Sequence, residues 1–398
     1  MATQNFRKAS LASLGKGYDG QLMFSQGDPF MLHKYLIRCV FPLFAATLAG
    51  HASAAPGPGA CSADLEEIAA FLPVNDAGAQ DHLASHGDRI ARALDTAREA
   101  AARAGDAAAC DVLLDAYLAA WRPGHLSVTH LGAAGGAAAP VKAGQAGDPR
   151  LPSLKVLGKD TVLLVFPSFK DSYAAAVRAL VHEHRAQLES RRNWIVDLRD
   201  NGGGADLTYA PLLPWLLDGD YPAHRTEFLV TPANLKAQED ICRQTAEQKA
   251  CSEMIAPIVA RMRAAPNGSM VLGGDARLTI EGIGKPEPKA PAKVAVLVDR
   301  DCGSTCEQFL LSVRTGFRVK LVGRPSAGVI DVSNLRPHPL PSGRVLKYGT
   351  TRSTRAADMR IDTIGIPPDI LLPRPLDEAG KAQEVAQVQR WLETGSWQ

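Results

Sequence analysis

The segment Asp301–Phe309, with the sequence DCGSTCEQF, constrains this chain more than any other. An apolar, β-branched run, Val294–Asp299, precedes it and is typical of a buried parallel strand. Phe309–Val313 follows with apolar residues at helical spacing. A strand, a tight turn and a helix therefore present the Ser304 hydroxyl at the mouth of an α/β sheet, where free N–H groups of the helix favour an oxyanion. Two interpretations remain: an N-cap serine, which is the commoner case, or a nucleophile.

A second strand–turn–helix pattern lies at Asn193–Gly204, with the sequence NWIVDLRDNGGG. Consecutive glycines allow backbone N–H groups to approach a ligand closely. A phosphate-binding loop is the alternative, but no Lys-Ser or Lys-Thr pair follows and the glycine spacing is not GxGxxG. A backbone donor for an oxyanion suits this pattern better.

The composition and the N-terminal pattern indicate an exported globular protein. The chain has 398 residues and a formal net charge of +2, which gives no electrostatic case for nucleic-acid binding. Lys34 and Arg38 precede an apolar stretch, and Ala52-Ser53-Ala54 fits a signal-peptide cleavage site. We expect a signal peptide that begins at Met31, after an N-terminal extension, and no stable membrane span once it is removed. The expected location is the periplasm or the outside of a bacterial cell.

Six of the seven cysteines lie outside the expected signal peptide, and an even number in an exported chain fits disulfides. Sequence does not fix the pairing, and free buried thiols are the alternative for each pair. Pairing between neighbours would join Cys61 to Cys110, Cys242 to Cys251, and Cys302 to Cys306.

The patterns divide the chain into four parts. We expect an extension and signal peptide at residues 1–54, a small helical domain at 55–131, a low-complexity linker at 132–150, and a catalytic domain at 151–398 with an insertion at about 218–290. Within the last part, Val345–Tyr348 and Thr350–Thr354 are predicted as strands of a hairpin after the Pro341–Gly343 turn.

Three motifs in this order resemble the tail-specific (C-terminal-processing) peptidases and the core of tricorn protease, in serine peptidase family 41. They are IVDLRDNGGG at 195–204, VLVDRDCGSTCEQF at 296–309 and IDTIGIPPDI at 361–370. A weaker match is WRPGHLSV at 121–128. The resemblance implies an α/β fold with a β/β/α spiral core like that of the Clp peptidase and crotonase folds, and a small helical N-terminal domain. It also implies a serine-type peptidase that acts on a peptide or protein substrate and needs no metal or other cofactor.

The same resemblance implies the catalytic roles. Ser304 would be the nucleophile, His125 the general base, and Asp362 the acid that holds the imidazole. The chain departs from the processing enzymes in two respects: their dyad lysine is absent from the segment 326–329, and the segment between His125 and the strand at Val162 is too short for a PDZ domain. The expected oxyanion donors are the backbone N–H groups of Gly202 or Gly203 and of Thr305.

Two other interpretations remain open. A non-catalytic ligand- or peptide-binding protein could use the same fold, and the test is whether the three catalytic candidates converge. A phosphate or nucleotide binder that uses the triple glycine is the weakest alternative.

Overall fold

The computed structural model describes residues 59–130, 151–244 and 248–397. The expected signal peptide and the 132–150 linker lie outside these residues. In the described part of the chain, no helix is both long and apolar enough to cross a membrane.

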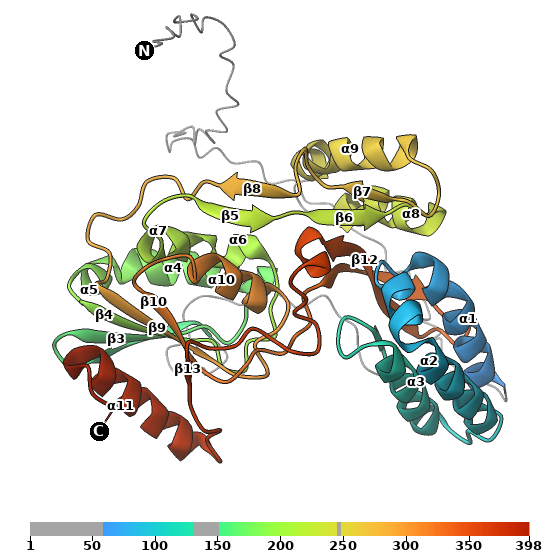
Figure 1. Cartoon of the computed structure of the whole chain (residues 1–398), viewed down its shortest axis with the longest axis horizontal. Helices are drawn as coiled ribbons and strands as arrows, with labels where there is room; N and C mark the ends of the chain where they lie inside the picture. The colour runs from blue at the N-terminus through green and yellow to red at the C-terminus, as the bar shows by residue number, and fades with distance from the viewer. Residues whose placement is uncertain (1–58, 131–150, 245–247, 398) are drawn as a thin grey trace, which may run out of the picture. The chain divides into compact units, whose positions relative to one another are not determined.

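A six-stranded sheet organises the C-terminal half, with the strand order β13-β10-β9-β4-β3-β2 (Figure 1). All neighbours pair in parallel except β2, which is antiparallel to β3. All five residues of β4 are buried, as expected for a parallel strand covered on both faces. The strands are β2 (Ser153–Leu157), β3 (Thr161–Val165), β4 (Asn193–Asp197), β9 (Lys293–Val298), β10 (Val319–Gly323) and β13 (Ile370–Leu371).

Helices cover both faces of this sheet. Alternate residues of β4 point to opposite faces: Trp194 and Val196 belong to the larger core, and Ile195 packs with Val388 and Leu392 of the C-terminal helix α11 (Glu378–Thr394) on the other face. The helices of the larger core are α4 (Ala174–Glu183), α5 (Arg185–Glu189), α6 (Asp206–Tyr209), α7 (Leu213–Leu216) and α10 (Thr305–Val313), with the short 3-10 helix η2 (Ala210–Leu212). The 3-10 helix η1 (Asp171–Tyr173), just before α4, has no buried residue.

A second sheet has β12 (Val345–Ser353) at its centre, paired with β1 (Ser127–Val128), β11 (Val332–Pro339) and β6 (Thr226–Leu229). β7 (Met270–Leu272) extends it beyond β6, and η4 (Thr354–Ala357) follows β12. The prediction of two strands at 345–348 and 350–354 is wrong, because β12 continues through Gly349 and its hairpin partner is β11. Gly349 is not a turn residue: its N–H donates to Asp76 and its carbonyl accepts from Ala77.

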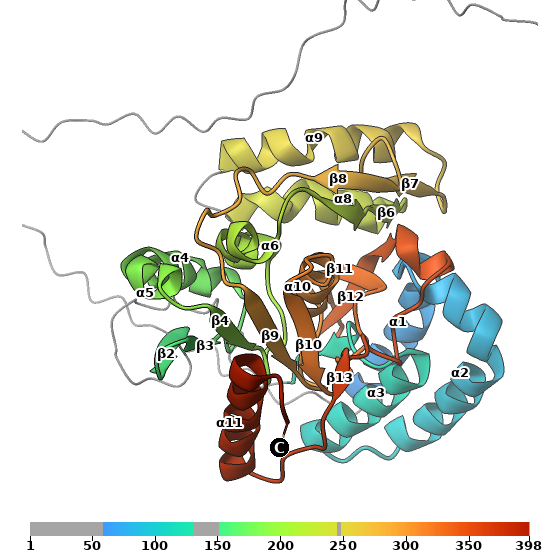
Figure 2. The same cartoon turned by 60° about the vertical axis from the view of Figure 1, so that its left-hand side comes forward.

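Three helices precede the sheets: α1 (Ala60–Asn75), α2 (Ala79–Ala101) and α3 (Ala107–Trp121). Their buried apolar residues form one core with Leu346 and Tyr348 of β12. Figures 1 and 2 both show these helices beside β12. The helical segment therefore packs on the hairpin that begins just after the segment 326–329.

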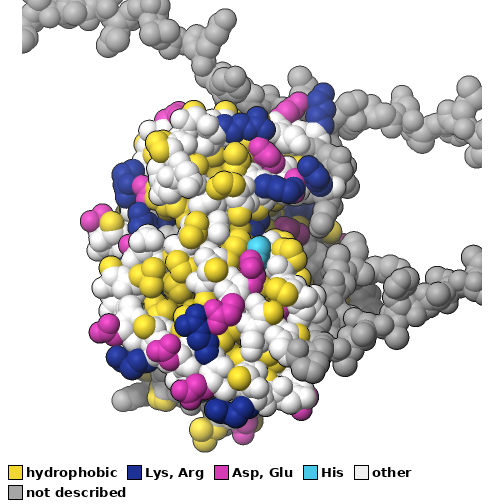
Figure 3. All heavy atoms as spheres, turned by 90° about the vertical axis from the view of Figure 1, so that its right-hand side faces the viewer, with side chains coloured by type: hydrophobic (Ala, Val, Ile, Leu, Met, Phe, Trp, Pro, Cys, Tyr) yellow, Lys and Arg dark blue, Asp and Glu magenta, His cyan; other side chains and the backbone are white. Residues whose placement is uncertain are grey.

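The predicted insertion contains α8 (Pro232–Asp240), η3 (Ile241–Gln244) and α9 (Gln248–Ala264), and a two-stranded sheet of β5 (Tyr221–His224) and β8 (Leu278–Glu281). Figure 2 shows α8 and α9 beside β6 and β7. On the face shown in Figure 3, the Lys and Arg side chains are mixed with Asp and Glu and do not form one basic patch. A nucleic-acid-binding surface requires such a patch, so this face does not have the charge pattern of one.

Candidate active site

Ser304 lies at the junction between the β9–α10 connection and the helix α10. Its φ angle is 57°, in the left-handed region that non-glycine residues rarely occupy. Such strain persists only where the surroundings enforce it, and it is common at functional sites. The turn leaves Ser304 partly exposed, whereas the helix behind it is largely buried.

The buried carboxylate of Glu307 fixes this turn. Oε2 accepts hydrogen bonds from the N–H groups of Ser304, at 3.1 Å, and Val329, at 2.9 Å. Oε1 accepts from the Ser326 hydroxyl, at 2.6 Å, and the Gly328 N–H, at 2.7 Å. Burial raises the pKa of Glu307, and these donors oppose that rise. Glu307 thus joins the serine turn to the segment 326–329, a structural role that fits its position one helical turn after Ser304.

The triple-glycine turn packs directly against the serine turn. A Cβ on Gly203 would lie 2.9 Å from Ser304 Cβ, so only glycine fits here. The Gly303 N–H donates to the Asn201 carbonyl at 3.2 Å, and Thr305 Oγ1 donates to the Gly204 carbonyl at 2.8 Å. The two strongest sequence motifs therefore meet at one place.

The predicted oxyanion donors differ in their availability. The Gly203 N–H donates to Asn201 Oδ1 at 2.9 Å, so in this conformation it is engaged. The N–H groups of Gly202 and Thr305 have no hydrogen-bond partner within the described residues. Thr305 is the first residue of α10, so its N–H also lies at the positive end of the helix dipole.

His125 lies in the turn between α3 and β1, and its φ angle of 53° is also left-handed. Its Nδ1 lies 2.5 Å from the Val332 carbonyl oxygen. Because a carbonyl only accepts, Nδ1 carries the proton and Nε2 has a free lone pair in the neutral ring. Burial lowers the pKa of His125 below its usual value, which favours this neutral form.

A buried ion pair holds the His125 turn. Both Nη groups of Arg122 donate to Asp76, at 2.5 and 2.7 Å, and Nη2 also donates to the His125 carbonyl at 3.0 Å. Both side chains are at most 1 % exposed. Sequence analysis missed Arg122 and Asp76 as a pair, because their separation along the chain gives no local pattern.

The Val329 side chain lies between the histidine and serine turns. A Cβ on Gly124 would lie 2.3 Å from Val329 Cγ1, and a Cβ on Gly303 would lie 3.0 Å from Cγ2. The residues immediately before His125 and Ser304 thus contact the two methyl groups of one side chain. The turns are brought together, but no hydrogen bond joins Ser304 Oγ to the His125 ring among the described contacts.

Asp362 lies near the histidine turn without a direct hydrogen bond to the ring. Its Oδ1 accepts from the Asp331 N–H at 2.7 Å, and the next residue, Val332, accepts from His125. The Asp331–Val332 backbone therefore connects the predicted acid to the predicted base. Burial, and next the nearby Asp331 carboxylate, raise the pKa of Asp362 to about 7.

A cluster of three aspartates has the spacing of a metal site. Oxygens of Asp200, Asp299 and Asp301 lie within 4.8 Å of one another, in the described part of the chain. Asp200 already accepts from Lys381 Nζ at 2.6 Å, and it is exposed. Nothing in these contacts connects the group to Ser304 chemistry.

Six cysteines form three disulfides, each between neighbours along the chain, which is the pairing that the sequence left open. One of them, Cys302–Cys306, has a Cα–Cα distance of 5.4 Å and brackets Ser304. The other two are Cys61–Cys110 and Cys242–Cys251.

The glycine turn and the serine turn, which pack together, both lie within a segment that matches a known protein family. Residues 160–372 match the model of peptidase family S41. This chain belongs to peptidase family S41. The S41 match covers the glycine turn, the serine turn and Asp362, but His125 lies before it.

Two solved structures of mature CPAF support the fold of this S41 chain. It is similar to mature CPAF in complex with lactacystin, with 12 % identity, a TM-score of 0.57, and coverage of 84 % of this chain and 98 % of that one. A second structure of mature CPAF gives 13 % identity, a TM-score of 0.55, and coverage of 84 % and 97 %. A putative peptidase from Parabacteroides merdae has 15 % identity, a TM-score of 0.47, and coverage of 83 % and 95 %. No sequence among the curated proteins matches this chain.

Proposed function

We propose that this member of family S41 is an active, exported serine peptidase in which Ser304 is the nucleophile and His125 the general base. The observation that carries the proposal is the hydrogen bond from His125 Nδ1 to the Val332 carbonyl. It leaves Nε2 as the proton acceptor, which is the tautomer that a general base requires. Membership of the family makes a peptide or protein the substrate.

The proposed reaction uses the histidine turn and the serine turn, which lie on either side of Val329. His125 Nε2 takes the Ser304 proton as Oγ attacks the scissile carbonyl, and the proton then passes to the leaving amine. Water, activated by the same nitrogen, hydrolyses the acyl-enzyme. For the first step the His125 ring and the Ser304 hydroxyl must approach until they form a hydrogen bond.

Asp362 completes the proposed Ser-His-Asp arrangement through the backbone. Its Oδ1 accepts a hydrogen bond from the N–H of Asp331, the residue just before β11, and the carbonyl of the next residue, Val332, accepts from His125. An ionised Asp362 also favours the imidazolium that forms during the reaction. Asp362 is thus proposed as a positioning residue.

The proposed oxyanion site uses the free N–H of Thr305 at the start of α10 and a donor from the glycine turn. Gly202 offers a free N–H, and Gly203 would have to exchange Asn201 for the oxyanion. Removal of one such donor from a serine peptidase costs roughly a hundred- to a thousandfold in rate.

Export is proposed from two observations. Residues 31–54 have the pattern of a signal peptide, and the six remaining cysteines form three disulfides, which persist in oxidising compartments. The periplasm or the extracellular space fits both.

A second candidate, a non-catalytic peptide-binding protein, is favoured by two observations. Ser304 and His125 are not hydrogen-bonded in this structure, and one predicted oxyanion donor is engaged. The two candidates differ in whether Ser304 is activated.

Labelling with a fluorophosphonate probe separates them. The wild-type protein should label, Ser304→Ala should not, and His125→Ala should lose most of the labelling. Matched controls are Ser190→Ala and His130→Ala, which change an exposed serine and an exposed histidine away from the site and should label like the wild type. A folded wild-type protein that does not label contradicts the peptidase and supports the binding protein.

A further inference from the structure

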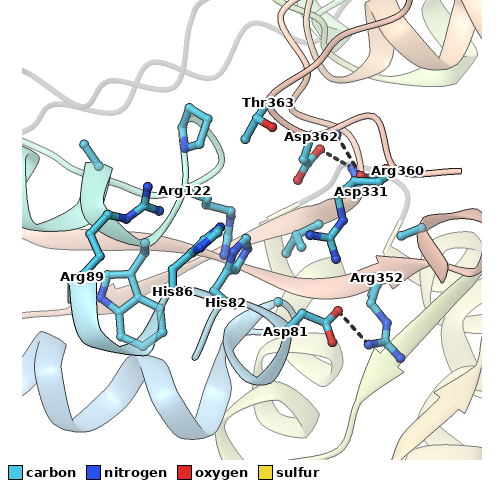
Figure 4. Close-up of a pocket in the computed structure, with 16 residues that line it drawn as sticks. Asp81, His82, His86, Arg89, Arg122, Asp331, Arg352, Arg360, Asp362 and Thr363 are labelled. Atoms are coloured by element: carbon cyan, nitrogen blue, oxygen red, sulfur yellow. Dashed lines mark hydrogen bonds and ion pairs between the residues drawn. The ribbon is translucent and has the colours of Figure 1, made fainter. Parts of the chain in front are cut away.

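A cavity of about 300 Å³ lies beside the candidate active site. Figure 4 shows its two sides: Arg89, His82 and His86 of α2 face Asp362 and Thr363, which follow β12 in the chain. None of these α2 residues belongs to the proposed catalytic machinery. This volume lies at the lower end of the range of small-ligand sites, so the cavity has room for a chain end or one side chain.

Most charged groups in the cavity wall already have partners of opposite charge. Two of the four arginines in the wall, and two of its three carboxylates, form ion pairs. The pairs are Arg122 with Asp76, Arg352 with Asp81, and Asp331 with Arg355.

Two arginines in the wall have no carboxylate partner in the described part of the chain. Arg89 Nε donates to the Ala120 carbonyl at 3.1 Å, which anchors the side chain and leaves both Nη groups free. Arg360 makes no ion pair there. Asp362 is the one unpaired carboxyl of the wall, and because its pKa is raised to about 7 it carries only part of a charge near neutral pH. The cavity therefore has an excess of positive charge.

A buried donor in the same wall also lacks a partner. Arg122 Nε is inaccessible to solvent and makes no hydrogen bond within the described residues, although the other guanidinium nitrogens are bonded. A buried N–H without an acceptor is costly. The imidazole ring of the half-buried His82 makes no hydrogen bond within the described residues, and burial lowers its pKa to about 4, so the neutral ring can donate one.

We propose that this cavity is a subsite for a carboxylate of the peptide substrate, bound by Arg89 and Arg360. The inference rests on the proposed peptidase function for its ligand, since Pro123 and Val332 also line the cavity. Pro123 lies two residues before His125, and the Val332 carbonyl accepts from the His125 ring. Both contacts place the cavity on the histidine side of the candidate active site. The carboxylate is either the C-terminus of the peptide or the side chain of Asp or Glu.

The test measures binding without turnover, in the Ser304→Ala background. Short fluorescein-labelled peptide pools of uncharged residues are compared by fluorescence anisotropy at low salt. One pool has a free C-terminus, one is amidated, and two are amidated with either Glu or Gln at a randomised position. We expect a carboxylate-bearing pool to bind at least about tenfold more tightly than its neutral counterpart, because hydrogen bonds to charged groups have that magnitude.

Variants then assign the preference to the cavity. Arg89→Ala and Arg360→Ala should each reduce it by about tenfold. Arg390→Ala, which removes an exposed arginine of α11 away from the cavity, should leave it unchanged. A preference for the free C-terminus identifies the chain end as the ligand, and a preference for Glu over Gln identifies the side chain. Equal binding of charged and neutral pools, no binding of either charged pool, or a preference that survives in the double variant would overturn the proposal.

This result is independent of the labelling experiment. Failure of fluorophosphonate labelling would remove the catalytic function and leave the binding measurement valid, because the latter does not use the Ser304 hydroxyl.

Discussion

The four hydrogen bonds that Glu307 accepts predict a large effect of the substitution Glu307→Gln. All four partners are donors, so the contacts require an ionised carboxylate with no proton of its own. An amide keeps one acceptor oxygen and replaces the other with an NH₂ group. If the oxygen remains with Ser326 and Gly328, the N–H groups of Ser304 and Val329 face a donor and lose their partner.

The magnitude follows from these two lost bonds. A hydrogen bond to a charged group contributes about 1.5–3 kcal/mol, so the loss of two lowers the free energy of unfolding by roughly 3–6 kcal/mol. That is a large part of the total stability of a protein, which is typically about 5–15 kcal/mol. The variant should also label more slowly with fluorophosphonate, because the Ser304 turn loses its fixed geometry.

Thermal and denaturant unfolding measure the first effect, with the disulfides intact. The matched control is Glu378→Gln, whose carboxylate is 88 % exposed and pairs only with Lys381, and which should change stability by less than about 0.5 kcal/mol. A change below about 1 kcal/mol for Glu307→Gln would show that the buried carboxyl is protonated in the wild type, and the reasoning above would be refuted.

Two further predictions concern pH and redox state. The folded state raises the pKa of Asp362 from 3.8 to about 7, so it binds more protons than the unfolded state between these values, and this residue lowers stability as pH rises through that window. The free energy of unfolding of Asp362→Asn should therefore rise by roughly 2–3 kcal/mol relative to that of the wild type between pH 5 and pH 8. A difference between the two proteins that does not change with pH would contradict the assigned cause. Replacement of both Cys302 and Cys306 by Ala should cost about 2 kcal/mol and slow the labelling of Ser304, whereas the Cys242/Cys251 double variant should cost about 3 kcal/mol and label normally. Equal labelling of both double variants would show that the bridge does not stiffen the serine turn.

The parallel sheet could be predicted because its strands are buried on both faces. The apolar runs at residues 161–166, 193–198 and 294–299 have no polar alternation, and β3, β4 and β9 lie there. The Gly and Ser motifs after β4 and β9 could also be assigned to one place, since the carboxyl ends of neighbouring parallel strands lie at one edge of the sheet.

The contacts that link distant segments could not be predicted. Gly349 has the composition of a turn, yet it lies inside β12 because its backbone pairs with Asp76 and Ala77 of the helical segment. The Val332 carbonyl has no sequence signature at all, because any residue offers one. The same holds for the Arg122–Asp76 pair, whose members are far apart along the chain and meet only through tertiary packing.

The position of Val329 also bears on which residue can act as the base in the mechanism proposed for this chain. The processing enzymes that this chain resembles draw their base from the segment that corresponds to 326–329, whereas here a valine of that segment fills the gap between the two glycines that precede His125 and Ser304. A long charged side chain at 329 would push the histidine turn away from the serine. In the proposed mechanism, His125 and a lysine base at position 329 would compete for one volume, so an exchange of one for the other in this chain would require both turns to be rebuilt together.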